Sequence, residues 1–183
     1  MLFRSTFVAT DVGQHQMWAI QHFHFDFPGQ LLTSGGFGTM GFGLGAAIGA
    51  QVAHPDTTVL HIAGDGCFRM NCHELATVSY YRLPIISVVF NNGTLGMVRQ
   101  WQNLIYGKRF SQTTLDRAPD FVKLAEAYGL KGKRVTNVAE LEDALREALE
   151  RKSGYVIDCA IDIDEMVRPM VSGGSHITNF LVD

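Results

Sequence analysis

The chain has 183 residues, which is enough for a single domain with a sizeable hydrophobic core. Hydrophobic residues make up 46% of it and charged residues 18%, and the formal net charge is −3. This balance excludes the basic surface that nucleic acids and anionic membranes require, so we expect neither as a partner. The apolar runs are shorter than the ~20 residues of a membrane span and no signal-peptide pattern opens the sequence, which predicts a cytoplasmic protein.

Strand-like and helix-like segments alternate along the chain. In chain order, the expected strands cover residues 5–10, 31–33, 58–63, 83–92, 132–135 and 155–161, and the expected helices cover 14–22, 41–52, 71–81, 120–128 and 138–151. This alternation implies crossover connections, so it predicts an α/β fold: one domain over residues 1–183, with three α/β/α layers and a mostly parallel sheet. Two segments lack a clear period, and we expect residues 102–114 to form a mobile loop and residues 168–183 a C-terminal tail.

A charged residue ends one of the most apolar strands. Asp65 follows "VLHIAG" and precedes Gly66, although a buried carboxylate is costly unless a cation meets it. Asn92 ends the next strand, and the carboxyl ends of parallel strands share the rim where ligands bind. Side-chain oxygens suit Mg²⁺ or Ca²⁺, and the glycines let a phosphate approach the backbone closely. We therefore predict a metal-bridged diphosphate site on this rim. His61, inside the same apolar strand, is expected to be partly buried or to lie at an interface.

These motifs resemble a known signature. "GDG" at 64–66 followed by "NN" at 91–92 is similar to the diphosphate-binding signature of thiamine-diphosphate-dependent enzymes. The flanking text resembles the C-terminal third of the acetohydroxyacid synthase family, also called acetolactate synthases, over residues 12–175. The segments that carry this resemblance are "VGQHQMWA" (12–19), "GGFGTMGFGLGAAIGA" (35–50) and "LGMVRQWQ" (95–102). The resemblance implies the thiamine-diphosphate-binding (pyrophosphate-binding) fold. It also implies a transferase that decarboxylates pyruvate and joins the product to a second 2-keto acid, in branched-chain amino acid biosynthesis.

The resemblance also implies a metal site and a cofactor site. Mg²⁺ would be held by the side chains of Asp65 and Asn92 and by the main-chain carbonyl of Thr94. Met40 would support the bent cofactor, and the Gly38 carbonyl would accept a hydrogen bond from its amino group; the alternative for Met40 is a plain core residue. The residues expected at thiamine diphosphate are Val12, Gly13, Gln14, His15, Gly38, Thr39, Met40, Gly64, Asp65, Gly66, Cys67, Asn92, Thr94, Leu95, Gly96 and Met97.

Three further residues match the substrate entrance of this family. They are Met97, Val98 and Trp101. Met97 and Trp101 are four residues apart and would share one face of any helix, so helix packing is the alternative. Cys67 stands where serine is common, and we expect little effect because its backbone would make the contact.

Some parts of the implied enzyme are missing from these 183 residues. The glutamate that starts the proton relay belongs to a pyrimidine-binding domain, so no catalytic residue of that kind is expected in this chain. The middle domain, which carries most FAD contacts, is also missing. We therefore expect a pyrimidine-binding domain on another chain or segment as partner, a homo- or hetero-oligomer, and scope for a regulatory subunit. The isolated chain is expected to bind cofactor weakly and to turn over no 2-keto acid.

Two other functions stay open at this point. The chain could be the β subunit of a two-chain thiamine-diphosphate-dependent 2-keto acid decarboxylase, such as sulfopyruvate decarboxylase. It could also be an inactive fragment that binds metal and diphosphate. The segment from Met97 to Trp101 favours the carboligating family over the first of these. The apolar surface around residues 37–48 predicts self-association of the isolated chain.

Overall fold

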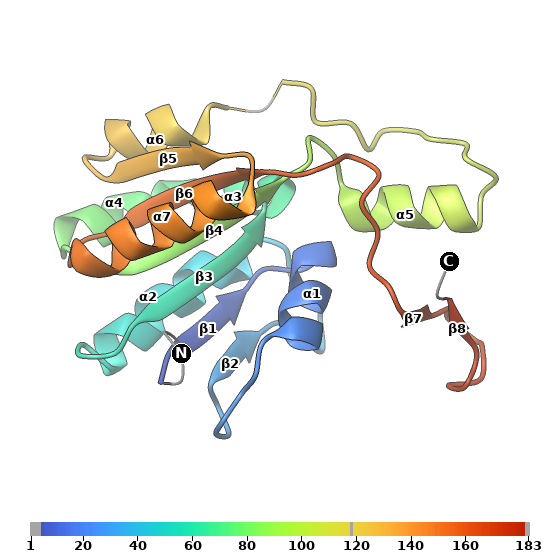
Figure 1. Ribbon diagram of the computed structural model, residues 1–183, viewed down its shortest axis with the longest axis horizontal. Coiled ribbons are helices and arrows are strands. Elements are labelled where there is room, and N and C mark those ends of the chain that lie inside the picture. Colours follow the sequence, from blue (N-terminus) through green and yellow to red (C-terminus); the bar gives the residue numbers. More distant parts are fainter. Residues whose placement is uncertain (1–4, 118, 182–183) are drawn as a thin grey trace.

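The computed structural model describes residues 5–117 and 119–181, and a six-stranded parallel sheet forms its centre (Figure 1). The predicted α/β architecture with three layers is confirmed. In sheet order, the strands are β2 (Leu31–Thr33), β1 (Phe7–Thr10), β3 (Val59–Gly64), β4 (Ile85–Asn91), β6 (Tyr155–Ala160) and β5 (Lys131–Val135).

The central strands are apolar because both of their faces are covered. On β4, Ile85 and Val89 contribute to the core on one side of the sheet, and Ile86 and Val88 contribute to the core on the other. A strand that alternates between two buried faces needs apolar residues at almost every position. The β-branched run of β4 therefore follows from its place in the middle of the sheet.

Among the described residues, six helices pack on the two faces of the sheet. One face carries α2 (Phe42–Ala53), α3 (Asp65–Asn71), α4 (Leu75–Tyr80) and α6 (Phe121–Ala127); the other carries α1 (Gln14–His22) and α7 (Val138–Glu150). A further helix, α5 (Gly96–Leu104), lies beyond the carboxyl ends of the strands (Figure 1). Within the described residues, the structure has no helix with the length and apolar character that crossing a membrane requires.

The helix expected over residues 71–81 begins earlier than predicted. Gly64 is extended and is the last residue of β3, and the helical backbone of α3 starts at the next residue, Asp65. A short 3₁₀ turn, Cys72–Glu74, then joins α3 to α4. The GDG motif is therefore the junction of a strand and a helix, which places Asp65 in the first helical turn.

The expected loop and tail both contain regular structure. Residues 102–104 complete α5, so the loop that was expected from residue 102 begins at Ile105. Its far end is held by an isolated antiparallel bridge between Thr114 and Thr94. In the expected tail, β7 (Met170–Val171) pairs with β8 (Phe180–Leu181); the last residues of the tail, 182–183, lie outside the described range. The mobility of the loop stays a prediction.

Candidate functional site

One pocket lies at the point in the sheet where the order of the strands reverses. From β1 the chain passes through α1 to β2 on one side, and β3 lies on the other side of β1. A ligand crevice is expected at the carboxyl ends of strands around such a reversal. The pocket lies there, with a volume of about 500 Å³ including its open mouth, and is lined by residues that follow β1, β3 and β4.

Most of the residues expected at the cofactor line this pocket. Those that do are Val12, Gly13, Gln14, His15, Met40, Gly64, Asp65, Gly66, Cys67, Asn92, Thr94, Leu95, Gly96 and Met97. Gly38 and Thr39 lie outside it, in an exposed turn where their N–H groups donate to the carbonyl and hydroxyl of Ser34. Of the expected entrance residues, Met97 and Val98 line the pocket and Trp101 does not.

Asp65 carries a buried oxygen that lacks a partner. The residue is 1% exposed, and its Oδ2 atom has no hydrogen-bond partner among the residues that the structure describes. Burial raises the pKa of this carboxyl to about 6, although backbone N–H groups of Gly66 and Gly93 offset part of the effect. A buried carboxylate oxygen in this state is suited to a bound cation.

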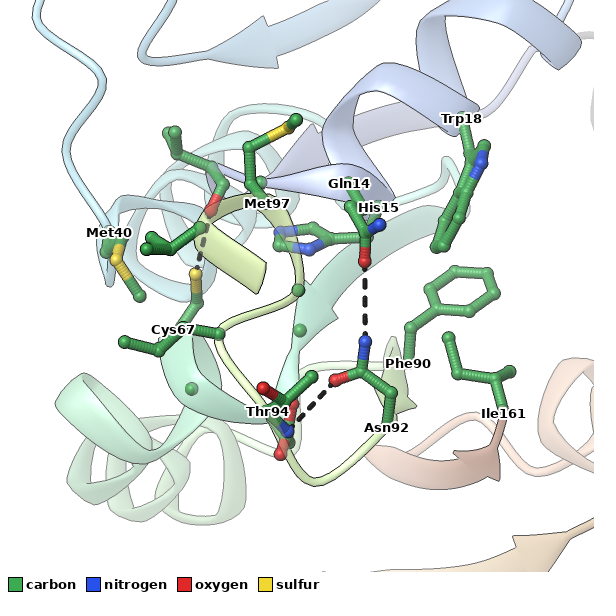
Figure 2. Close-up of a pocket in the computed structure, with 18 residues that line it drawn as sticks. Gln14, His15, Trp18, Met40, Cys67, Phe90, Asn92, Thr94, Met97 and Ile161 are labelled. Atoms are coloured by element: carbon green, nitrogen blue, oxygen red, sulfur yellow. Dashed lines mark hydrogen bonds between the residues drawn. The ribbon is translucent and has the colours of Figure 1, made fainter. Parts of the chain in front are cut away.

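Asn92 is held by hydrogen bonds at both ends of its amide. Its Oδ1 accepts from the Thr94 N–H at 3.2 Å, and its Nδ2 donates to Gln14 Oε1 at 3.4 Å (Figure 2). Thr94 is buried in turn, and its hydroxyl donates to the Thr113 carbonyl at 2.9 Å. The segment after β4 is therefore fixed by the returning end of the loop.

His15 is buried as a neutral imidazole. Burial lowers the pKa of His15 to about 4, and Nε2 has no hydrogen-bond partner within the described part of the chain. A Cβ atom on Gly64 would lie 2.8 Å from His15 Nδ1, so only glycine leaves room for the ring here. The unpaired ring nitrogen can donate to or accept from a ligand in the pocket.

The Cys67 thiol is unsuited to act as a nucleophile. Its Sγ donates to the Val12 carbonyl at 3.1 Å, and burial raises the pKa of the thiol to about 12. Cys67 and Met40 form one side of the pocket, on the left of Figure 2.

The opposite side of the pocket is an apolar wall that sequence reasoning missed. It consists of Trp18, Phe90 and Ile161, on the right of Figure 2, with the Trp18 and Phe90 rings 5.9 Å apart. Two of them carried a usable signal. Trp18 is one helical turn after Gln14, and Phe90 is two residues before Asn92, so each shares a face with a predicted site residue.

The candidate metal ligands at this rim are all oxygen atoms. Across residues 5–117 and 119–181, no three His, Cys, Asp or Glu side chains are grouped so that they could hold a metal ion. Candidate ligands are the Asp65 carboxylate and the oxygens of Asn92 and Thr94. Such oxygen donors suit hard cations with remaining ligands from water or phosphate, and the buried Asp65 oxygen fits this role.

Comparisons with known proteins give matches over most of the chain. A family model described as "Thiamine pyrophosphate enzyme, C-terminal TPP binding domain" matches residues 11–159. The chain is 48% identical to the "Probable acetolactate synthase large subunit" of Methanococcus aeolicus over 97% of its length. It is 49% identical to the "Acetolactate synthase isozyme 2 large subunit" of Escherichia coli over 95%, and 47% identical to the mitochondrial "Acetolactate synthase catalytic subunit" of Saccharomyces cerevisiae over 97%. The chain spans 30%, 32% and 26% of these relatives, respectively.

Proposed function

We propose that this chain is the cofactor-binding part of an acetolactate synthase, because it belongs to the thiamine pyrophosphate enzymes as their C-terminal TPP binding domain. The complete enzyme would decarboxylate pyruvate and transfer the product to a second 2-keto acid. Relatives with this name match nearly the whole chain at 47–49% identity.

The observation that carries the proposal is the buried oxygen of Asp65, which no described residue meets with a hydrogen bond. In the proposal, the Asp65 carboxylate, the Asn92 amide oxygen and the Thr94 carbonyl would hold Mg²⁺, whose charge would neutralise that of the diphosphate. When bound, thiamine diphosphate supplies the electron sink that decarboxylation of a 2-keto acid requires. The chain itself holds and orients this group.

Each side of the pocket has its own task in this proposal. Gly64 leaves room for the neutral His15 ring and Gly66 leaves room for Leu95, beside the backbone that would meet the diphosphate. Met40 supports the cofactor rings on one side, and the apolar wall of Trp18, Phe90 and Ile161 excludes water on the other. Met97 and Val98, which line the pocket, would form the entrance for the 2-keto acid, and Trp101 lies outside the pocket on the same helix.

The partners are also part of the proposal. Because the chain covers about a third or less of its relatives, the glutamate of the pyrimidine-binding domain comes from elsewhere, as do most contacts to any FAD. We propose that the chain works in an oligomer that supplies this domain, with or without a regulatory subunit. The cytoplasmic location stays a prediction.

Titration of thiamine diphosphate tests the cofactor site. With Mg²⁺ present and the pyrimidine-binding domain supplied, the assembled protein is expected to bind thiamine diphosphate, and Asp65→Ala is expected to weaken binding at least tenfold, or by about 1.4 kcal/mol. Asp56→Ala, which removes an exposed carboxylate in the turn before β3, serves as the control and should leave binding unchanged. Unchanged magnesium-dependent binding in Asp65→Ala contradicts the proposal.

Product analysis tests the reaction. With pyruvate, Mg²⁺, thiamine diphosphate and the pyrimidine-binding domain supplied, acetolactate is the expected product. Release of CO₂ without carboligation would instead identify a decarboxylase subunit such as that of sulfopyruvate decarboxylase. Magnesium-dependent cofactor binding without any turnover would identify an inactive binding domain.

A further inference from the structure

Gln100 is a buried amide in an otherwise half-exposed helix. It lies on α5 and is 2% exposed. Its Oε1 accepts from the Val167 N–H at 2.9 Å, and its Nε2 donates to the Val167 carbonyl at 3.1 Å and lies 2.9 Å from Met170 Sδ. Gln100 therefore pairs with the backbone of the C-terminal segment in the way that one strand pairs with another.

Gln14 continues this chain of hydrogen bonds into the pocket. Its Nε2 donates to Gln100 Oε1 at 2.9 Å and to the Glu165 carbonyl at 2.8 Å. An amide nitrogen has two hydrogens, so both are used by these partners. The Gln14 oxygen consequently faces the other way, where it accepts from Asn92 Nδ2 (Figure 2).

Two backbone groups of the C-terminal segment, the Val167 N–H and the Glu165 carbonyl, determine the orientation of Gln100 and Gln14, and through Gln14 that of Asn92. A backbone N–H can only donate, so it requires the oxygen of Gln100 on its side. That oxygen and the Glu165 carbonyl both require the nitrogen of Gln14, and the oxygen of Gln14 then requires the nitrogen of Asn92. The Asn92 oxygen is left on the far side, toward Thr94. Turning over any one of the three amides would place two donors or two acceptors against each other, which is costly in a buried site.

We propose that Gln100 is a positioning residue that, through Gln14, makes Asn92 present its oxygen to the cation site. The C-terminal segment from Glu165 to Met170 is then part of the site without lining the pocket. When this segment docks on α5, the hydrogen bonds of Gln100 and Gln14 orient the Asn92 amide for cation binding. The identity of the cation as Mg²⁺ rests on the proposed function; the orientation of Asn92 does not.

Two substitutions at Gln100 in the full-length protein separate positioning from packing. Gln100→Met keeps the shape and removes every hydrogen bond of the amide. Gln100→Glu keeps an acceptor for Gln14 and for the Val167 N–H, and its buried carboxyl is expected to be protonated, so that its O–H donates to the Val167 carbonyl. The matched control is Gln102→Met on the same helix, because the Gln102 side chain bonds only to Ser111 in the loop among the described residues.

The first measurement is Mg²⁺ affinity at saturating thiamine diphosphate. Gln100→Met is expected to lower this affinity about tenfold, while Gln100→Glu and Gln102→Met stay within threefold of the unaltered protein. Equal affinities in Gln100→Met and Gln102→Met would overturn the proposal. A loss in Gln100→Glu as large as in Gln100→Met would overturn it too, because the acceptor for Gln14 is kept there.

The second measurement needs no cofactor. The Thr94 N–H donates to Asn92 Oδ1, so a turned Asn92 amide removes this bond and speeds hydrogen exchange at Thr94. Exchange at Thr94 is expected to rise about tenfold in Gln100→Met and to stay unchanged in Gln102→Met. Unchanged exchange in Gln100→Met would refute the orienting role. If the unaltered protein fails to bind thiamine diphosphate, the proposed function is wrong, and this exchange result still decides the role of Gln100. Should Gln100→Met fail to fold, Gln100→Glu is compared with Gln102→Met, and faster Thr94 exchange in Gln100→Glu refutes the role.

Discussion

Two buried carboxylates at the ends of neighbouring strands have opposite surroundings. Asp11 follows β1 and Asp65 follows β3, and each is 1% exposed. Asp11 Oδ2 lies 3.1 Å from His61 Nε2, and Asp11 Oδ1 accepts from the Gly43 N–H at 3.1 Å. Asp65 Oδ2, in contrast, has no partner in the described part of the chain. One charge is satisfied within the fold, and the other is left for a ligand.

The pKa values of the two groups follow this difference. Burial alone would raise the pKa of Asp11, but the hydrogen bond and attraction of His61, with the Gly43 N–H, hold it below its usual value. The pKa of Asp65 is raised to about 6 by burial. At this rim, the pKa of a buried carboxyl group therefore depends on the hydrogen-bond partners and charges around it.

The network around Asp11 is structural. His61 is fully buried, contrary to the expectation of partial burial, and its Nδ1 lies 3.2 Å from the hydroxyl of Ser87. An Asp–His–Ser series of this kind also occurs in hydrolases. Here Ser87 is only 2% exposed and lies within β4, in the middle of the sheet, so no substrate reaches it. The network joins β1, β3, β4 and α2.

The largest effect is expected when the satisfied carboxylate is removed. Asp11→Ala leaves His61 and the Gly43 N–H buried without their partner, which should lower the free energy of unfolding by about 3–5 kcal/mol. Urea unfolding of the 183-residue chain measures this loss, with the exposed Asp56→Ala as control. A loss below about 1 kcal/mol would show that the network is dispensable.

The unsatisfied carboxylate should behave in the opposite way. One pKa unit corresponds to about 1.4 kcal/mol, so the rise from 3.8 to about 6 makes ionised Asp65 cost about 3 kcal/mol in the metal-free chain. The native state binds the proton more tightly than the unfolded state. The stability that the protonated group contributes is therefore complete below pH 3.8 and is lost as the pH rises through about 6.

Asp65→Asn tests this sign. With EDTA present, the variant is expected to be about 1–3 kcal/mol more stable than the unaltered chain at pH 7.5, and the advantage should disappear near pH 4. Urea unfolding at both pH values measures the difference. A variant that is less stable at pH 7.5 would mean that the Asp65 carboxylate already has a partner.

A matched pair of glycines in α2 gives smaller effects of opposite sign. A Cβ on Gly43 would lie 2.7 Å from His61 Nε2 and 2.8 Å from the Asp11 backbone nitrogen, so Gly43→Ala should destabilise the chain by about 1–3 kcal/mol. A Cβ on Gly45 would meet no described atom within 4 Å, so Gly45→Ala should stabilise it by about 0.5–1 kcal/mol. Thermal unfolding of both variants checks the pair; a shift of the same sign in both contradicts the role given to Gly43.

The smallest effect is expected at Cys67. In Cys67→Ser the hydroxyl can donate to the Val12 carbonyl as the thiol does, so stability should change by no more than about 1 kcal/mol. The pKa of about 12 also predicts that iodoacetamide leaves the Cys67 thiol of the folded chain unmodified at pH 8. Mass spectrometry measures this; rapid alkylation would contradict the burial of Cys67.

Local pattern was enough to predict most of the elements and the rim of the site. The helix Gln14–His22 and the strand Leu31–Thr33 have the expected bounds, and Asp65 and Asn92 line one pocket. The reason is that strand and helix periodicity, and the common rim of parallel strands, depend on residues near one another in the sequence. The early start of α3 was missed because two glycines around Asp65 read as a turn.

Tertiary structure alone decided which polar groups are satisfied. Asp11 finds His61 from 50 residues away, and Gln14 finds the Glu165 carbonyl from 151 residues away. No period in the sequence encodes such pairs, because they depend on how the elements pack against one another. The sequence by itself determined the α/β alternation, the glycines beside Asp65 and the oxygen donors at the strand ends. Packing determined that Asp11 has hydrogen-bond partners within the fold and that Asp65 Oδ2 has none among the described residues. It also determined that Gln100 and Gln14 connect the C-terminal segment to Asn92 by hydrogen bonds.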